Sequence, residues 1–157
     1  MFKKILLAYD GSAPAKKGFE RSLEMARCFN AELCIVAVAR PPEFAEDVET
    51  EAILENARSH LNSELGKLRA QACSSGVQPS LQVRVGHPAE QIIAAAEEWN
   101  ADLIVTGHRG KGLFERWLLR FGFAPGHCVC SLCGDGDQVN GVIGLDIRGN
   151  RNIDIAA

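Results

Sequence analysis

Several features that identify common protein classes are missing from this chain of 157 residues. Its net charge is −3 and aromatic residues make up only 6% of it, so it lacks the basic excess and the basic patches interleaved with aromatics that are typical of nucleic-acid binding. No apolar run approaches the ~20 residues of a membrane-spanning helix. We therefore expect no nucleic-acid partner and no insertion into a membrane.

Signals for export and for a second domain are missing as well. The opening residues MFKKILLAYDGS contain lysines and an apolar run, but that run is too short for a signal peptide and Asp10 follows it. No low-complexity repeat and no linker divides the chain. We expect a cytoplasmic protein whose composition, 46% hydrophobic and 24% charged, suits a single globular core.

What the chain does contain is an alternation of strand-like and helix-like segments. Short apolar or alternating runs predict strands, and amphipathic segments between them predict helices. The strands are expected over 3–9, 31–39, 80–85 and 101–107, and the helices over 13–29, 46–73 and from Pro88 to about Trp99. This β-α-β-α-β-α-β order predicts an α/β fold: an open, doubly wound, mainly parallel sheet of Rossmann-like type.

Ligands of such sheets bind beyond the carboxyl ends of the strands, so the residues at those ends are the candidates for a site. In the segment TGHRGKG, backbone N–H groups at Gly107 and Gly110 can form an anion site with the following helix N-terminus. His108 and Arg109 add donors or positive charge, and Arg109 can pair with a phosphate through two parallel bonds. The last predicted strand therefore points to a phosphate-binding loop.

The other strand ends supply groups suited to the rest of a nucleotide. Asp10 can accept from a ribose hydroxyl or help to hold a metal ion, and Val38 can offer an apolar edge to a flat base. Ala8 is small enough to leave room. The predicted nucleotide-binding residues are Ala8, Asp10, Val38, Thr106, Gly107, His108, Arg109 and Gly110.

Each of these residues also has a simpler interpretation. Asp-Gly after a strand is usually only a turn, Val38 is by default a core residue, and a lone G-x-x-G occurs by chance in many loops. Arg109 is as easily a surface charge as a phosphate ligand. The nucleotide hypothesis depends on finding these features together, each at the end of its own strand.

Three segments carry a family resemblance. KKILLAYDGS, VGHPAEQIIAAAEEWNADLIVTGHRGKG and FERWLL resemble universal stress proteins of the ATP-binding kind, over about residues 1–119. The resemblance implies a five-stranded sheet, with strand order 3-2-1-4 for the strands predicted here, a homodimer and a bound adenine nucleotide such as ATP, with or without Mg²⁺. It also implies a stress-response sensor or signalling module.

The family's phosphate motif, G-x2-G-x9-G-[S/T], breaks at its last step. Gly107 and Gly110 match its first half, but Arg120 and Phe121 stand where Gly and Ser or Thr are due. Reading the possible codons from Arg120 onward at their second base permits Gly-Ser at this place. The same shift forces strand-forming residues at positions His127, Asp135 and Asp137. We therefore hypothesise that residues 120–157 are a frameshifted tail, the alternative being a genuinely divergent one.

This hypothesis has consequences for the tail and for binding. It predicts weakened nucleotide binding, and it makes the family's fifth strand doubtful, which would expose a sheet edge and remove the strand through which relatives commonly dimerise. His127, Cys128, Cys130 and Cys133 have a composition that suits zinc, but they crowd within a few residues, so we expect no metal site there. No nucleophile–base pair and no paired carboxylates stand at a strand end. The alternatives to a nucleotide-binding sensor are a slow ATPase or nucleotidyl-transfer enzyme and a nucleotide-free partner-binding protein.

Overall fold

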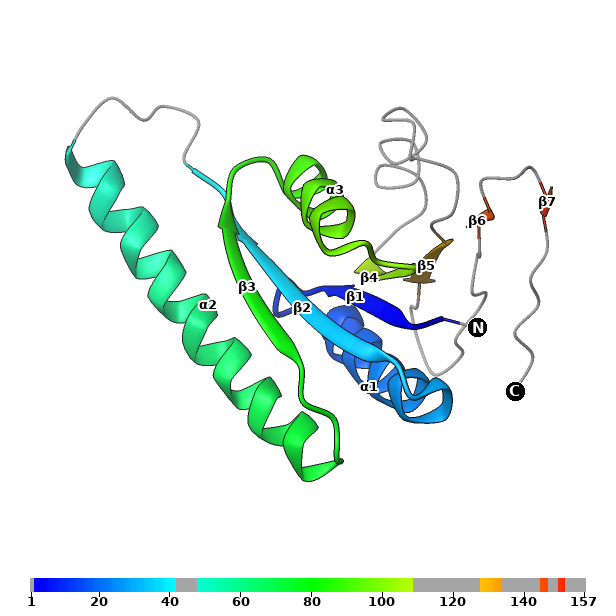
Figure 1. The fold of residues 1–157 in the computed structure, drawn as a ribbon. Helices are drawn as coiled ribbons and strands as arrows, with labels where there is room; N and C mark the ends of the chain where they lie inside the picture. Colours follow the sequence, from blue (N-terminus) through cyan, green and yellow to red (C-terminus); the bar gives the residue numbers. More distant parts are fainter. Residues whose placement is uncertain (1, 42–47, 109–127, 134–144, 147–149, 152–157) are drawn as a thin grey trace.

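The computed structural model describes residues 2–41, 48–108, 128–133, 145–146 and 150–151. Within them, the main feature is a five-stranded parallel sheet in the order β3-β2-β1-β4-β5 (Figure 1). Its strands are β1 (Lys4–Ala8), β2 (Glu32–Ala39), β3 (Ser80–Val85), β4 (Leu103–His108) and β5 (Cys128–Cys133). The predicted α/β class and the order 3-2-1-4 are confirmed.

The doubt about the fifth strand was wrong. Residues Cys128–Cys133 pair in parallel with β4 over its whole length, from Leu103 opposite Cys128 to His108 opposite Cys133. The outer edge of β4 is therefore covered. A segment with an atypical side-chain pattern can still pair in this way, because the ladder is formed by backbone N–H and C=O groups. Further along, β6 (Leu145–Asp146) and β7 (Asn150–Arg151) form a separate antiparallel pair.

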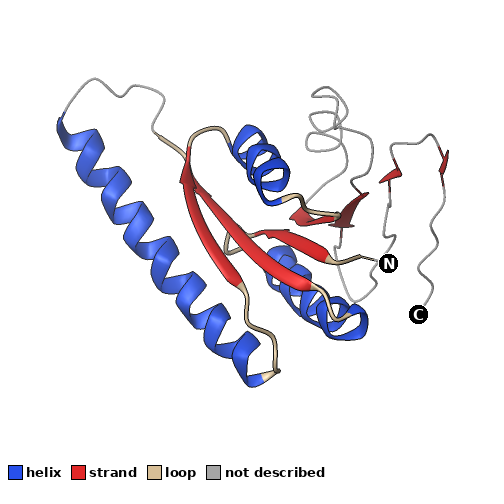
Figure 2. Cartoon of the chain, viewed as in Figure 1, coloured by secondary structure: helices blue, strands red, loops and turns tan. Residues whose placement is uncertain are grey.

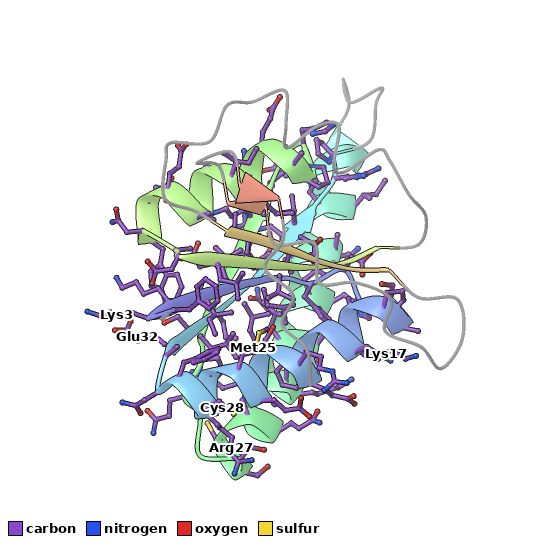
Figure 3. All side chains as sticks on the ribbon, turned by 90° about the vertical axis from the view of Figure 1, so that its right-hand side faces the viewer. Lys3, Lys17, Met25, Arg27, Cys28 and Glu32 are labelled. Carbon is purple, nitrogen blue, oxygen red and sulfur yellow. The ribbon has the colours of Figure 1, made fainter. Side chains whose placement is uncertain are left out.

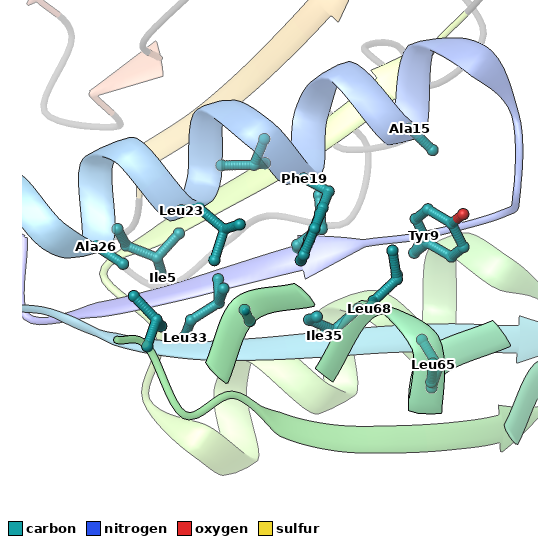
Figure 4. Packing of buried hydrophobic residues seen from close by; sticks show 14 of the residues in the cluster. Ile5, Tyr9, Ala15, Phe19, Leu23, Ala26, Leu33, Ile35, Leu65 and Leu68 are labelled. Atoms are coloured by element: carbon teal, nitrogen blue, oxygen red, sulfur yellow. The ribbon is translucent and has the colours of Figure 1, made fainter. Parts of the chain in front are cut away.

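Helices cover both faces of the sheet (Figure 2). They are α1 (Ala13–Phe29), α2 (Val48–Ser74) and α3 (Pro88–Trp99), close to the predicted ranges. One buried cluster joins α1 and α2 to the sheet face that carries Ile5 and Leu7, and Figure 4 shows Phe19 and Leu23 of α1 within it. A second cluster joins α3 to the opposite face, which carries Leu6 and Ile104.

Local signals in the sequence explain where the helices begin and end. Ser12 is the N-cap of α1, and Asn30 and Asn100 end α1 and α3 in the left-handed conformation with φ of 50° and 56°. Such residues tolerate this conformation better than most, so they are common at helix ends. Among the described residues, no helix is both long enough and apolar enough to cross a bilayer.

The amino end of the sheet is held by Asp102. Its Oδ2 accepts hydrogen bonds from the backbone N–H groups of Lys3 at 2.8 Å and Lys4 at 2.9 Å, which ties the start of β1 to the start of β4. The Lys4 ammonium lies 5.4 Å from the centre of the Trp99 ring and donates to the Trp99 carbonyl at 3.2 Å. These polar contacts lie at the rim opposite the carboxyl ends of the strands, so they align β1 and β4 without occupying the candidate site.

Candidate functional site

The chain reverses its direction of winding between β1 and β4. From β1 it continues through α1 to β2 and then β3 on one side, whereas β4 lies on the other side of β1. In open parallel sheets, the crevice at this switch point, beyond the carboxyl ends of the strands, is the usual ligand site. Ala8, the last residue of β1, stands in register with Thr106 of β4, so these two residues mark the switch point.

Three predicted site residues share one face of the sheet at this rim. Ala8 and Val38 pack against the cluster beneath α3, as Leu6 and Val36 do two residues before them. Thr106 follows Ile104 of the same cluster by two residues, so strand alternation places it on that face as well. Ala8 and Val38 are half-buried, which leaves a mainly apolar surface partly open beside the switch point.

Thr106 is the unusual member of this group. It is 4% exposed, and its hydroxyl oxygen has no hydrogen-bond partner among the described residues. Leaving a buried hydroxyl unpaired costs about 1–3 kcal/mol. The sequence indicated Thr106 from its position near a strand end. It could not predict the unpaired hydroxyl, because the pattern of apolar residues does not indicate whether a buried hydroxyl has a hydrogen-bond partner.

Gly107 has a packing role that the sequence did not show. A Cβ atom at this position would lie 2.3 Å from the backbone carbonyl carbon of Pro14 and 2.4 Å from the backbone nitrogen of Ala15. The first turn of α1 therefore presses against β4 at a distance that only glycine permits. On this face the missing side chain makes room for a helix.

Asp10 lies in the turn that joins β1 to α1. One carboxylate oxygen, Oδ1, accepts a hydrogen bond from the N–H of Ser12 at 2.9 Å, and Ser12 Oγ accepts from the N–H of Ala15 at 3.2 Å. Gly11 between them has a φ of +80°, where residues with side chains are strained. The exposed Asp10 thus stands at the rim, with one oxygen already used in the turn.

The structure describes only part of the phosphate-binding half of the predicted site. His108 is the last residue of β4 and pairs along the backbone with Cys133. Arg109, Gly110, Arg120 and Phe121 lie outside the described residues, as does His127 of the zinc-like cluster. Within the described part of the chain, no three His, Cys, Asp or Glu residues are grouped so that they can hold a metal ion.

Two polar groups near the rim were not predicted. Burial, followed by the charges of Glu64 and Asp10, raises the pKa of Tyr9, which is buried between α1 and α2. On the other face, Arg84 donates to Glu98 Oε1 at 3.2 Å and to Gln82 Oε1 at 3.1 Å, and it stands in register with Val38. The only sequence signal for the second group was the pair of polar residues alternating along β3.

This geometry defines a class: doubly wound parallel α/β proteins, which usually bind ligands beyond the strand ends at the switch point. Comparison with known proteins gives the family, since residues 1–120 match the sequence model of the Universal stress protein family. The chain belongs to the universal stress protein family. The match ends at the residue where the phosphate motif breaks.

Individual relatives agree with this assignment. A universal stress protein of Thermus aquaticus is 39% identical over 114 residues, which cover 71% of this chain and 81% of the relative. The crystal structure of a family protein from Burkholderia pseudomallei superposes with a TM-score of 0.69 at 25% identity, covering 85% of this chain and 96% of that one. An Arabidopsis thaliana family protein with bound AMP has the same fold, with a TM-score of 0.63 at 18% identity over 87% of this chain and 94% of that one.

Proposed function

We propose that this stress-response protein is a cytoplasmic sensor or signalling module that binds ATP or a related adenine nucleotide in the crevice between β1 and β4. The observation that carries the proposal is the position of Ala8, Val38 and Thr106 on one sheet face, at the ends of three adjacent strands. The half-buried Ala8 and Val38 form a mainly apolar, partly open surface that suits a flat base, and the unpaired hydroxyl of Thr106 lies buried beside it. The AMP bound by the Arabidopsis relative supports the choice of ligand.

In this proposal the two halves of the nucleotide meet different chemistry. The base lies along Val38 with Ala8 leaving room for it, and Thr106 supplies a hydrogen bond. The phosphates lie against the backbone N–H groups from Gly107 to Gly110, with His108 and Arg109 nearby. Asp10 stands at the rim beside the ribose, in the turn between β1 and α1.

The altered tail weakens the phosphate half. Arg120 and Phe121 stand where the family motif supplies Gly and Ser or Thr, which would donate to a phosphate. Hydrogen bonds to charged groups contribute about 1.5–3 kcal/mol each, and 1.4 kcal/mol corresponds to a tenfold change in affinity. We therefore expect this chain to discriminate less strongly between ATP and AMP than a relative with an intact motif.

Calorimetric titration with AMP and ATP tests the proposal. The wild-type chain should bind both saturably, and Thr106→Val, which keeps the shape and removes the hydroxyl, should weaken binding by roughly two- to tenfold, the equivalent of one neutral hydrogen bond. Ser74→Ala is a matched control, because this hydroxyl donates to the carbonyl of Gln71 at the end of α2 and should not affect affinity. Folded wild-type protein that binds no adenine nucleotide would refute the proposal and favour a partner-binding role.

A further inference from the structure

We infer that Asp10 is a positioning residue, whose carboxylate fixes the first turn of α1 and, through that turn, Gly107 at the start of the phosphate-binding segment. The inference rests on the proposed function and deepens it, because it separates residues that would touch the nucleotide from the residue that places them. It also concerns the form of the ligand, since an aspartate that works by holding a turn does not require a metal-bound nucleotide.

The first link is the turn itself. Asp10 Oδ1 accepts from the Ser12 N–H at 2.9 Å, which closes a local turn around Gly11. Gly11 has a φ of +80°, and no atom lies within 4 Å of an added Cβ. Glycine is therefore needed here for the backbone conformation and not for a close contact. The hydrogen bond from Ser12 to Asp10 therefore holds a conformation that the chain would otherwise leave easily.

The second link runs from Ser12 into the helix. Ser12 has an extended backbone, with φ of −70° and ψ of 161°, and its hydroxyl oxygen accepts from the Ala15 N–H at 3.2 Å. Its carbonyl accepts from the Lys16 N–H at 3.0 Å. Both bonds satisfy donors that a helix leaves unpaired at its start, so the position of Ser12 determines where α1 begins.

The third link joins α1 to β4. The backbone of Pro14 and Ala15 occupies the place of a Cβ at Gly107, at distances of 2.3 Å and 2.4 Å. Contact this close is backbone against backbone, and no side chain can absorb a shift of either partner. A shift of the first turn of α1 must therefore shift Gly107 as well. The three links connect Asp10 to the phosphate segment through hydrogen bonds in the backbone turn and a backbone contact, with no flexible side chain between α1 and Gly107.

The chemistry of the first link identifies a decisive substitution. An asparagine side-chain oxygen can accept the same hydrogen bond from Ser12 N–H, whereas it carries no charge to hold a cation. Asp10→Asn thus keeps the turn and removes the charge, and Asp10→Ala removes both. Ser12→Ala breaks the second link and leaves the Asp10 carboxylate in place.

The experiment compares these variants by titration with AMP, with and without Mg²⁺. Asp10→Ala and Ser12→Ala should each weaken binding by roughly five- to tenfold, the equivalent of losing one helix cap. The double variant should be no weaker than either single one, since both act on the same turn. Asp10→Asn should restore affinity to within about twofold of wild type in both conditions, and Glu20→Gln on the exposed side of α1 serves as control.

Hydrogen exchange at the Gly107 amide provides a readout that does not depend on a ligand. Asp10→Ala and Ser12→Ala should accelerate exchange there, and Asp10→Asn should not. Affinity of Asp10→Asn as low as that of Asp10→Ala would overturn the inference, because the charge would then matter and not the turn. Unchanged exchange of the Gly107 amide in Asp10→Ala would also overturn the inference, whether or not the wild-type chain binds a nucleotide. Failure of the wild-type chain to bind a nucleotide would instead count against the proposed function.

Discussion

Cys34 differs from Cys28 and Cys73 in ways that predict its reactivity. Cys34 is fully buried beneath α3, and burial raises the pKa of its thiol to about 11, although the nearby Arg84 acts in the opposite direction. Cys28 and Cys73 are exposed, and Figure 3 shows Cys28 on the outer side of α1. Since thiolates and not thiols react with alkylating agents, the three residues should respond very differently.

At pH 8, iodoacetamide should label Cys28 and Cys73 at least 100-fold faster than Cys34. A thiol with a pKa of about 11 is roughly 0.1% ionised at this pH, against roughly a quarter for an ordinary cysteine, and burial slows access further. Mass spectrometry of tryptic peptides measures the rates, and labelling in concentrated urea gives the control in which all three react alike. Rapid labelling of Cys34 in folded protein would contradict the described core.

The same raised pKa also makes stability depend on pH, with a defined sign. The folded state favours the neutral thiol of Cys34. The contribution of this thiol to the free energy of unfolding is therefore fully present below the pKa of a cysteine in the unfolded chain, roughly 8.5. As the pH rises from there toward about 11, the unfolded chain loses a proton that the folded chain keeps, and the folded state becomes less stable. Cys34→Ala should remove this part of the alkaline decline in stability.

Among single residues, the sequence identified positions more easily than roles. Ala8, Val38 and Thr106 were predicted as site residues from their places at strand ends. In the structure Ala8 and Val38 pack against the cluster beneath α3, and strand alternation after Ile104 places Thr106 on the same face. The roles of Gly107 and Asp10 could not be predicted, because they depend on a contact with α1 and on a hydrogen bond within the turn. Such contacts follow from how elements meet in space, and hydrophobic periodicity carries no information on them.

At the scale of elements, two glycines test how closely the helices pack. An added methyl at Gly107 would collide with the backbone of α1, whereas at Gly66, inside α2, nothing lies within 4 Å of the added atom. We expect Gly107→Ala to destabilise the fold by about 1–3 kcal/mol or more, as overpacking does. Gly66→Ala should stabilise it by about 0.5–1 kcal/mol, because alanine favours a helix over glycine.

Urea unfolding of the two variants measures both effects in one experiment. Each variant adds the same methyl group, so the pair controls for the intrinsic difference between glycine and alanine in the unfolded chain. Opposite signs are the expected result. Equal stability of Gly107→Ala and wild type would mean that α1 and β4 separate readily, which would also break the third link of the Asp10 inference.

Elements with strong local signals were predicted well, and β5 was not. The range of α1, 13–29, was correct because Ser12 and Asn30 mark its ends, and α2 was predicted over 46–73 against Val48–Ser74. The segment CVCSLC was assigned to an anomalous tail, yet it pairs with β4 along six residues. A strand beside an open edge gains backbone hydrogen bonds whatever its side chains, so its formation depends on the neighbouring strand more than on its own pattern.

At the scale of the whole molecule, two observations place a boundary near residue 120. The family match ends at residue 120, and the phosphate motif fails at Arg120 and Phe121. The frameshift hypothesis accounts for both, and the pairing of β5 with β4 shows that the chain after this boundary still supplies a fifth strand. Sequencing the gene tests the origin of the tail, since an in-frame ancestor with no spare base at the junction of Leu119 and Arg120 would rule the hypothesis out.

The functional consequence of the tail is tested with a chain whose codons from Arg120 onward are read in the alternative frame. If the frameshift hypothesis holds, this frame supplies Gly and Ser at the end of the phosphate motif, and it should strengthen ATP binding by at least about tenfold, the equivalent of one charge-assisted hydrogen bond. Adenosine is the control ligand, because in the proposed site it would occupy the base half and has no phosphate for the restored donors. Parallel titrations of both chains should therefore show a gain for ATP and almost none for adenosine. An equal gain for the two ligands would mean that the tail acts on the crevice as a whole, by stabilising the sheet edge beside β4, and that the phosphate half of the proposed site is assigned to the wrong residues.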